Sequence, residues 1–171
     1  MPTHTPLLVV LDLDETLIAA RPAVRPQRKP DFWWAGRPIY LRPHVRPFLE
    51  DRFERGHVAI WTASDAGYAL PILERILQGP TDRFRFVWTR EQCVPSDHPD
   101  VPRKPIQRLL DHGADARRVV LVDDRPATFG GDVGNGRLIP SYHGDRDDDA
   151  LQLLAKTLQG LDRMPDVREA L

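Results

Sequence analysis

The fold is decided by residues 7–17, which read Leu-Leu-Val-Val-Leu-Asp-Leu-Asp-Glu-Thr-Leu. The apolar first half predicts a strand buried on both faces of a parallel sheet. Asp12 and Asp14 then emerge together at the carboxyl end of that strand, where open α/β sheets hold their ligands. Residues two apart on an extended chain point the same way, and two like charges there repel unless a cation separates them. We therefore predict a Mg²⁺ site with oxygen ligands at this edge.

The composition predicts a single domain over residues 1–171. The chain has 171 residues with 41% hydrophobic content, which is enough to bury one core. Its net charge of -1 does not indicate nucleic acid or an anionic lipid surface as a general partner. No apolar stretch is long enough to span a bilayer and no signal sequence is evident, so we expect a cytoplasmic protein without a membrane partner. Cys93 is the only cysteine, which excludes an intrachain disulfide.

Strand and helix patterns alternate after the first strand. A Pro- and Arg-rich segment at about residues 20–40 reads as a small insertion with a hairpin turn at Ala35-Gly36. The remaining spacing leaves no room for a large cap domain. We predict an α/β fold, a single Rossmann-like domain with a central parallel sheet and helices on both faces. The expected helices span residues 44–55, 68–77, 105–112 and 148–160, and the expected later strands span residues 57–61, 84–88, 119–122 and 138–139.

Three further polar segments follow predicted strands or lie in loops. Thr62 and Ser64 come directly after the second strand, where a hydroxyl can donate to a phosphoryl oxygen. The alternative is an N-cap for the next helix, which Ser64 or Asp65 could serve equally well. Lys104 is one of only three lysines, and an ammonium group there would counter carboxylate and phosphoryl charge. Asp123 and Asp124 leave another apolar strand, as a shared Mg²⁺ site would require.

In this order and on these elements, the four segments resemble the haloacid dehalogenase superfamily of aspartate phosphohydrolases, whose fold type we expect here. Within it the chain is similar to the small C-terminal-domain phosphatases, also called NLI-interacting-factor-like phosphatases. The resemblance covers nearly the whole chain from about residue 7. It rests on Asp-Leu-Asp-Glu-Thr-Leu at 12–17, Leu-Arg-Pro-His-Val at 41–45, Thr-Ala-Ser at 62–64, Arg-Glu-Gln-Cys at 90–93 and Leu-Ile-Pro-Ser-Tyr at 138–142.

The resemblance implies a two-step phosphatase mechanism. Asp12 would attack phosphorus and form an aspartyl-phosphate, and Asp14 would act as general acid and then general base. Thr62 and Lys104 would hold the non-bridging oxygens, with Asp123 orienting Lys104 or a metal-bound water. Mg²⁺, the implied cofactor, would be held by Asp12, the main-chain carbonyl of Asp14, and Asp124.

The expected substrate is a phosphoserine or phosphothreonine side chain on a protein or peptide, because a site without a large cap is open. As substrate-binding residues we name Thr16, Ser64, Arg90, Phe32, Trp33 and Trp34. The three aromatic residues would form a wall for a Pro-containing peptide, although packing of the insertion onto the domain fits them equally well. Arg90 would pair with a second phosphate or an acidic residue, and a structural ion pair is its alternative.

Two other functions stay open at this point. One keeps the enzyme but changes the substrate to a nucleic-acid terminal phosphate or a small metabolite phosphate. The other is a non-catalytic scaffold that binds phosphorylated partners. A scaffold has no need of the whole set of predicted catalytic residues, so their joint presence argues against it. The sequence does not indicate an oligomeric state, and we assume a monomer. We expect residues 130–136 to form a mobile loop near the mouth of the site.

Overall fold

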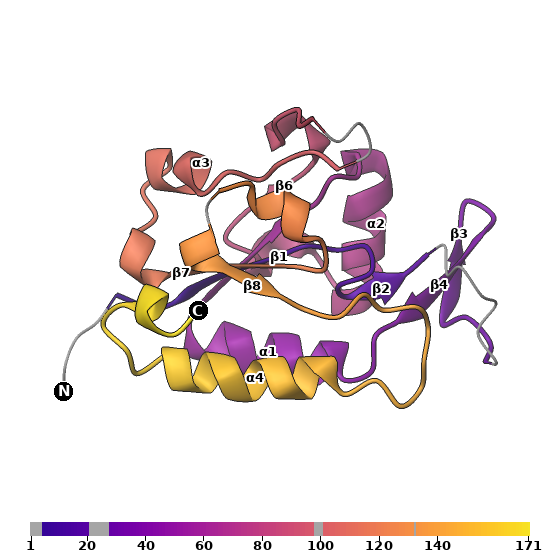
Figure 1. Cartoon of the computed structure of the whole chain (residues 1–171). Coiled ribbons are helices and arrows are strands. Elements are labelled where there is room, and N and C mark those ends of the chain that lie inside the picture. The colour runs from indigo at the N-terminus through magenta and orange to yellow at the C-terminus, as the bar shows by residue number, and fades with distance from the viewer. Residues whose placement is uncertain (1–4, 21–27, 98–100, 132) are drawn as a thin grey trace.

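A five-stranded parallel sheet forms the centre of the protein (Figure 1). The computed structural model describes residues 5–20, 28–97, 101–131 and 133–171. The central strand is β1 (Leu8–Leu11), whose four residues are all buried, as its apolar sequence predicts. The sheet has the order β6-β5-β1-β7-β8. The other strands are β5 (His57–Trp61), β6 (Val87–Trp88), β7 (Val119–Asp123) and β8 (Gly136–Leu138), and each neighbouring pair is parallel.

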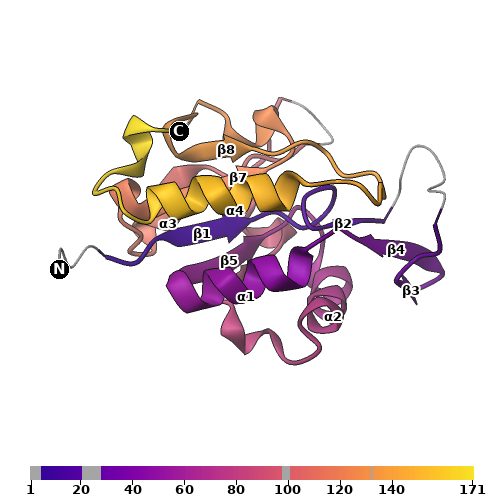
Figure 2. The same ribbon diagram turned by 90° about the horizontal axis from the view of Figure 1, so that it is seen from below.

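Helices cover both faces of this sheet, which confirms the predicted fold class. The helices α1 (Val45–Arg55), α2 (Ala66–Leu77) and α4 (Ala150–Leu161) share one apolar core with Val9 and Leu11 of β1. The short helix α3 (Ile106–Asp111) packs on the opposite face, against a smaller core that contains Leu8 and Val10. Figure 2 shows α1 and α4 side by side over the same face of the sheet. None of the described helices has the length and apolar character needed to cross a membrane.

The strand order places the site. The chain runs from β1 outward to β5 and β6, then returns to β7 on the other side of β1. The connections therefore diverge between β1 and β7, and ligands of open α/β sheets bind at such a point, beyond the carboxyl ends of the strands. Hydrogen bonding continues one residue past β1, since the backbone N–H of Asp12 donates to Val122 at 3.0 Å. Asp12 is thereby fixed beside the end of β7.

The predicted insertion forms a small antiparallel sheet. The strands β2 (Ile18–Ala19), β4 (Arg37–Leu41) and β3 (Phe32–Trp34) lie in the order β2-β4-β3, and residues 21–27 are outside the described part. Ala35 and Gly36 make the predicted turn, with φ of 45° and 75°. Positive φ at both central residues is the geometry of a type I′ turn, whose twist matches that of the paired strands.

Two local predictions were wrong. The strand expected at residues 84–88 is limited to Val87–Trp88, because Phe84 closes the 3-10 turn Thr81–Arg83 and packs its ring on Phe53 of α1. The segment 130–136 does not end near the mouth of the site. Asn135 is buried there, and its side-chain amide donates to the carbonyls of Ala116 and Val119, at the start of β7. This end of the segment therefore lies at the edge of the sheet opposite the site.

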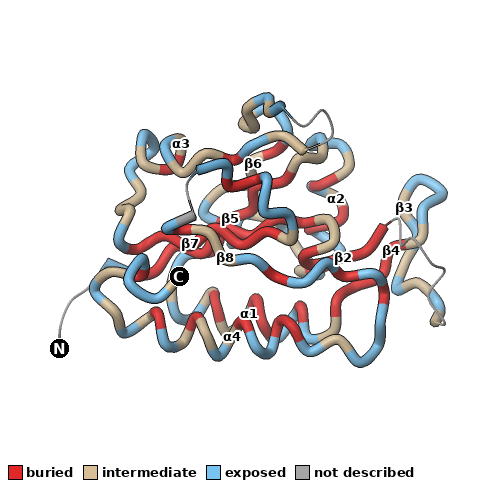
Figure 3. The backbone as a smooth tube through the Cα atoms, in the orientation of Figure 1, coloured by how far each residue is buried: buried red, intermediate tan, exposed pale blue. Residues whose placement is uncertain are grey.

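Three buried arginines bind the C-terminal segment of the chain to the rest of the domain. Arg42, after β4, makes two hydrogen bonds to Asp148 at 2.7 and 2.8 Å. Arg52 of α1 binds Asp162 at 2.8 Å. Arg118, before β7, donates to several main-chain carbonyls of residues 161–164. Figure 3 shows the buried sheet and the exposed outer sides of α1 and α4. All three arginine side chains are buried, and a buried charged group needs partners such as these.

We expect Arg42→Met to lower the free energy of unfolding by about 3 kcal/mol, because it leaves the Asp148 carboxylate without its partner in a partly buried position. Urea denaturation followed by circular dichroism measures this change. Arg55→Met is the matched control, since Arg55 pairs with Asp51 on the surface of α1 and such pairs contribute less than about 1 kcal/mol. Equal losses in the two variants would contradict this account of Arg42.

Candidate active site

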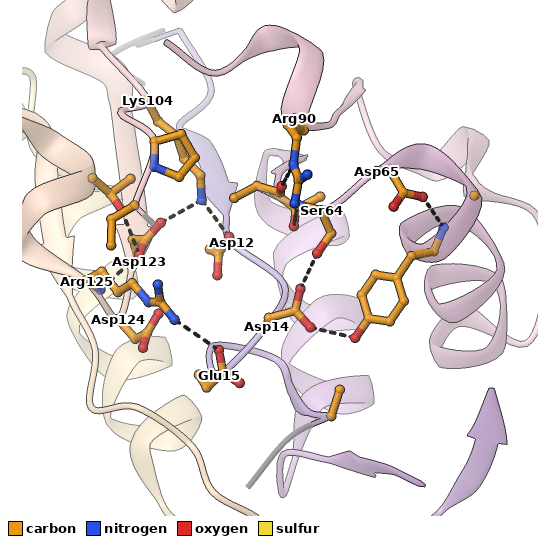
Figure 4. A pocket seen from close by; sticks show the side chains of 18 of the residues that line it. Asp12, Asp14, Glu15, Ser64, Asp65, Arg90, Lys104, Asp123, Asp124 and Arg125 are labelled. Carbon is orange, nitrogen blue, oxygen red and sulfur yellow. Dashed lines mark hydrogen bonds and ion pairs between the residues drawn. The ribbon is translucent and has the colours of Figure 1, made fainter. Parts of the chain in front are cut away.

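Lys104 lies at the centre of the site, between two carboxylates. Its Nζ donates to Asp12 at 2.5 Å and to Asp123 at 2.6 Å, and all three side chains are buried (Figure 4). Burial disfavours the ammonium, but the two carboxylates outweigh this effect and raise the pKa of Lys104 above its ordinary value. Lys104 therefore stays positively charged. The residue comes from the loop before α3, so this contact joins that loop to the ends of β1 and β7.

Three carboxylates meet beside Lys104. Ligand atoms of Asp12, Asp123 and Asp124 lie within 4.8 Å of one another, a spacing that suits a cation. Burial raises the pKa of Asp12 well above its ordinary value, and Asp123 acts in the same direction against the Lys104 ammonium. Burial also raises the pKa of Asp124, while the hydroxyl of Ser141, donating at 2.6 Å, opposes this.

The charges at this point do not balance without a further cation. With all three carboxylates ionised, one ammonium faces three negative charges in a mostly buried space, and the raised pKa values of Asp12 and Asp124 reflect the cost of holding these charges without a further cation. A divalent cation with oxygen ligands matches both the surplus and the ligand type, and Mg²⁺ is commonly held by one or two carboxylates. The residues present therefore fit the predicted metal. Asp123 joins the two predicted carboxylate ligands here, since its side chain belongs to the same cluster.

Asp14 is held away from this cluster by two hydroxyl groups. Ser64 donates to one carboxylate oxygen at 2.8 Å, and Tyr68 donates to the other at 2.6 Å. Burial, followed by the charge of Asp14, raises the pKa of Tyr68, so its hydroxyl keeps the proton that it donates. The Asp14 carboxylate thus lies outside the carboxylate cluster of Asp12, Asp123 and Asp124, but it lines the same cavity as Asp12.

Thr62, Ser64 and Asp65, which follow β5, each have a different hydrogen-bond partner. Thr62 is buried, lines the cavity, and accepts a hydrogen bond from the backbone N–H of Ser64 at 3.1 Å. Asp65 is the N-cap of α2 and accepts from the backbone N–H of Tyr68 at 2.9 Å. Of the two N-cap candidates, Asp65 has that position, and the Ser64 hydroxyl binds Asp14 instead.

A cavity of about 780 Å³ contains these groups and opens at the carboxyl edge of the sheet. Arg90 and Trp34 line it, as expected of substrate-binding residues. Arg90 is exposed, its Nε donates to the carbonyl of Ala63 at 2.8 Å, and among the described residues no carboxylate forms an ion pair with it. Figure 4 shows Arg125 near Asp124 and Arg90 near Ser64, on opposite sides of Asp14.

Three of the predicted substrate-binding residues lie elsewhere. Thr16 is completely buried beneath the turn that follows Asp14 and is not among the residues that line the cavity. Phe32 packs against the main core and lies under the guanidinium of Arg75, 5.4 Å from its ring centre. Trp33 is 61% exposed and is also absent from the cavity lining. The alternation of side chains along β3 turns Trp33 to the face opposite Phe32 and Trp34, and of the two inner residues Trp34 lines the cavity.

The sequence analysis missed several residues that the structure brings to the site. Tyr68 is the most direct, since it contacts Asp14; an N-cap at Asp65 would have placed it on the first turn of α2, next to the strand ends. Arg37 and Arg125 also line the cavity. Arg42 acts one layer below, where it donates to the carbonyl of Thr16 at 3.0 Å and so supports the turn after Asp14.

The first strand of this Rossmann-like sheet ends in two aspartates, and the next elements add a threonine, a lysine and a second acidic pair. Together they define a phosphatase fold of the haloacid dehalogenase type. Comparison with known families agrees with that class. The sequence profile of the NLI interacting factor-like phosphatases matches residues 7–168. The chain therefore belongs to the NLI interacting factor-like phosphatase family.

Relatives of this family cover nearly the whole chain. "CTD small phosphatase-like protein 2" of Dictyostelium discoideum is 31% identical over 166 residues, 94% of this chain and 28% of the relative. Human "Carboxy-terminal domain RNA polymerase II polypeptide A small phosphatase 1" is 32% identical over 173 residues, 96% of this chain and 63% of the relative. The chain thus spans less than two thirds of the length of either curated relative.

Solved structures share the fold at lower identity. The fission yeast RNA polymerase II CTD phosphatase Fcp1, as an R271A variant bound to beryllium fluoride, has a TM-score of 0.56 and 21% identity, covering 92% of this chain and 51% of that one. The N-terminal part of BF1531 from Bacteroides fragilis, complexed with Mg, has a TM-score of 0.52 and 16% identity, covering 89% and 40%. At these identities the similarity concerns the fold.

We expect Mg²⁺ to stabilise the protein, because the cation would compensate the surplus negative charge of Asp12, Asp123 and Asp124. At a concentration about 100 times its dissociation constant, a ligand adds about 2.7 kcal/mol. For a domain of this size such a gain raises the melting temperature by about 5–10 °C. Differential scanning calorimetry with MgCl₂ and with EDTA measures the shift.

Asp124→Asn should abolish most of this Mg²⁺-dependent shift, because it removes one charged ligand. The matched control is Asp82→Asn, which removes an exposed carboxylate outside the cavity and should keep the full shift. A shift of equal size in the two variants would show that the cation binds elsewhere.

Proposed function

We propose that this domain is a Mg²⁺-dependent phosphomonoester hydrolase that acts through an aspartyl-phosphate on phosphoserine or phosphothreonine in a protein segment. The observation that carries the proposal is the position of Asp12. Its carboxylate lines the cavity, at the carboxyl end of the central strand, in direct contact with the Lys104 ammonium and with the acidic cluster. A carboxylate nucleophile for an anionic phosphate needs positive charge beside it, which the Lys104 ammonium and the proposed Mg²⁺ would supply.

In the first step, an oxygen of Asp12 forms a bond to phosphorus while the bond from phosphorus to the serine or threonine oxygen breaks. Asp14 gives its proton to that leaving oxygen. Lys104 and Thr62 hold the non-bridging oxygens, and Asp123 keeps Lys104 in place through its 2.6 Å contact. Asp12, Asp124 and the main-chain carbonyl of Asp14 would hold Mg²⁺, which would compensate the charge of the phosphate oxygens.

In the second step, water attacks phosphorus and the bond to Asp12 breaks, which releases inorganic phosphate and restores the carboxylate. Asp14, now without its proton, accepts a proton from the attacking water. The same carboxylate thus serves both half-reactions and returns to its starting state. Lys104 keeps the Asp123 carboxylate as its partner throughout, and in the intermediate the phosphoryl oxygens would face its ammonium where the Asp12 carboxylate stood.

A protein segment is the favoured substrate because the cavity is open. Between β1 and β5 the described residues form only the small sheet β2-β4-β3 and α1, so a side chain on another polypeptide can enter. The relatives' names support this substrate class, since they refer to a C-terminal domain of RNA polymerase II. Trp34 supplies an apolar surface beside the cavity, as recognition of an extended peptide requires.

Arg90 would recognise negative charge next to the phosphorylated residue. Its exposed guanidinium is not used in an ion pair within the described part of the chain, whereas its Nε contact with Ala63 fixes the base of the side chain. Arg37 and Arg125 line the same cavity. An acidic residue or a second phosphate flanking the target is therefore the expected sequence context.

Phosphate release by the purified protein with Mg²⁺ tests the proposal. The substrates are phosphoserine and phosphothreonine peptides, oligonucleotides with 3′- or 5′-phosphates, and small phosphate esters. We expect peptides to be hydrolysed fastest. Asp12→Asn should lower turnover on the order of 10⁴-fold or more, because it removes the nucleophile, while circular dichroism shows a retained fold. Appreciable hydrolysis by this variant would refute the assignment of Asp12.

We expect Arg90→Ala to lower kcat/KM about 10-fold for a peptide with an acidic residue beside the phosphoserine, since it removes one charge-assisted hydrogen bond. The loss should appear mainly in KM. Hydrolysis of p-nitrophenyl phosphate, which has no flanking charge, should be nearly unchanged. Arg117→Ala is the control, because Arg117 pairs with Asp115 before the start of β7, at the opposite edge. A uniform loss on both substrates would refute a recognition role for Arg90.

A further inference from the structure

Both oxygens of the Asp14 carboxylate accept a hydrogen bond from a hydroxyl group. Tyr68 donates to one at 2.6 Å and Ser64 to the other at 2.8 Å. Asp14 is not among the residues whose ligand atoms meet in the carboxylate cluster of Asp12, Asp123 and Asp124. The two hydroxyls thus give Asp14 a different set of partners on the α2 side of the cavity.

The donors themselves are held firmly in place. The backbone N–H of Tyr68 binds the Asp65 side chain at 2.9 Å, and the Tyr68 ring packs against the main core. Ser64 is fixed from two directions, since its N–H donates to Thr62 at 3.1 Å and its carbonyl accepts from the N–H of Arg90 at 2.9 Å. Side chains locked in this way can orient a partner accurately.

We propose that Tyr68 is a positioning residue for Asp14. Its hydroxyl keeps the Asp14 carboxylate away from the carboxylate cluster of Asp12, Asp123 and Asp124 and directs it at the leaving-group oxygen. The inference rests on the proposed function, in which Asp14 transfers the proton. It adds a restriction on substrates: the Tyr68 hydroxyl matters for esters whose leaving group must be protonated, such as those of serine and threonine. An ester with a stable leaving anion, such as nitrophenolate, gains little from a well-placed acid.

Tyr68→Phe tests this directly, because it removes the hydroxyl and keeps the ring that packs on the core. We expect kcat for a phosphoserine peptide to fall about 10- to 100-fold, part of the general-acid contribution. Turnover of p-nitrophenyl phosphate by the same variant should change less than about 3-fold on the same reasoning. The informative quantity is the ratio of the two rates, which a general loss of folded protein would leave unchanged.

Tyr142→Phe is the matched control. It also removes a tyrosine hydroxyl that forms a hydrogen bond in the domain, here to the carbonyl of Leu41 at 3.0 Å, but that hydroxyl does not contact Asp14. We expect the ratio of the two rates to stay at the wild-type value. Ser64→Ala, which removes the other donor to Asp14, should lower the ratio in the same direction as Tyr68→Phe.

A double-mutant cycle completes the test. If Tyr68 acts through Asp14, adding Tyr68→Phe to Asp14→Asn should have little further effect on the phosphoserine peptide. An unchanged ratio in an active Tyr68→Phe enzyme, or additive losses in the double variant, would overturn the inference while leaving the proposed function intact. Absence of phosphate release from both esters by the wild-type protein would overturn the proposed function and this inference together.

Discussion

The site depends on the buried ion pairs that the Lys104 ammonium forms with Asp12 and Asp123. A lysine in this position is stable only with both of its carboxylate partners, and Asp12 and Asp123 in turn repel each other without it. The three residues belong to three separate parts of the chain: the end of β1, the loop before α3, and the end of β7. The register of β1 against β7 is therefore fixed by charge at one edge as well as by apolar packing inside the sheet.

Much of the fold could be predicted from the sequence, because its central elements have continuous apolar patterns. The strands β1, β5 and β7 and the helix α1 lie within one residue of their expected bounds. Prediction failed where a tertiary contact decides the local structure. Phe84 has strand-forming character but packs on α1, and Asn135 looks like a loop residue but is buried against the start of β7.

The site divides in a similar way. Acidic pairs that directly follow apolar strands must meet at one edge of a parallel sheet, so Asp12, Asp123 and Asp124 could be found by position alone. A hydroxyl's partner cannot be found in that way. Thr16 follows the first acidic pair in the sequence but is completely buried. Tyr68, which lies 54 residues after Asp14, contacts that carboxylate.

The contact between Arg42 and Asp148 joins positions 106 residues apart. Arg42 also supports the turn after Asp14, through the carbonyl of Thr16. During synthesis Asp12, Asp14 and Lys104 all leave the ribosome before Asp148 does. A nascent chain therefore carries these residues before the turn after Asp14 gains its support from the Arg42–Asp148 contact. The site of this domain is therefore completed late in translation, when α4 packs against α1.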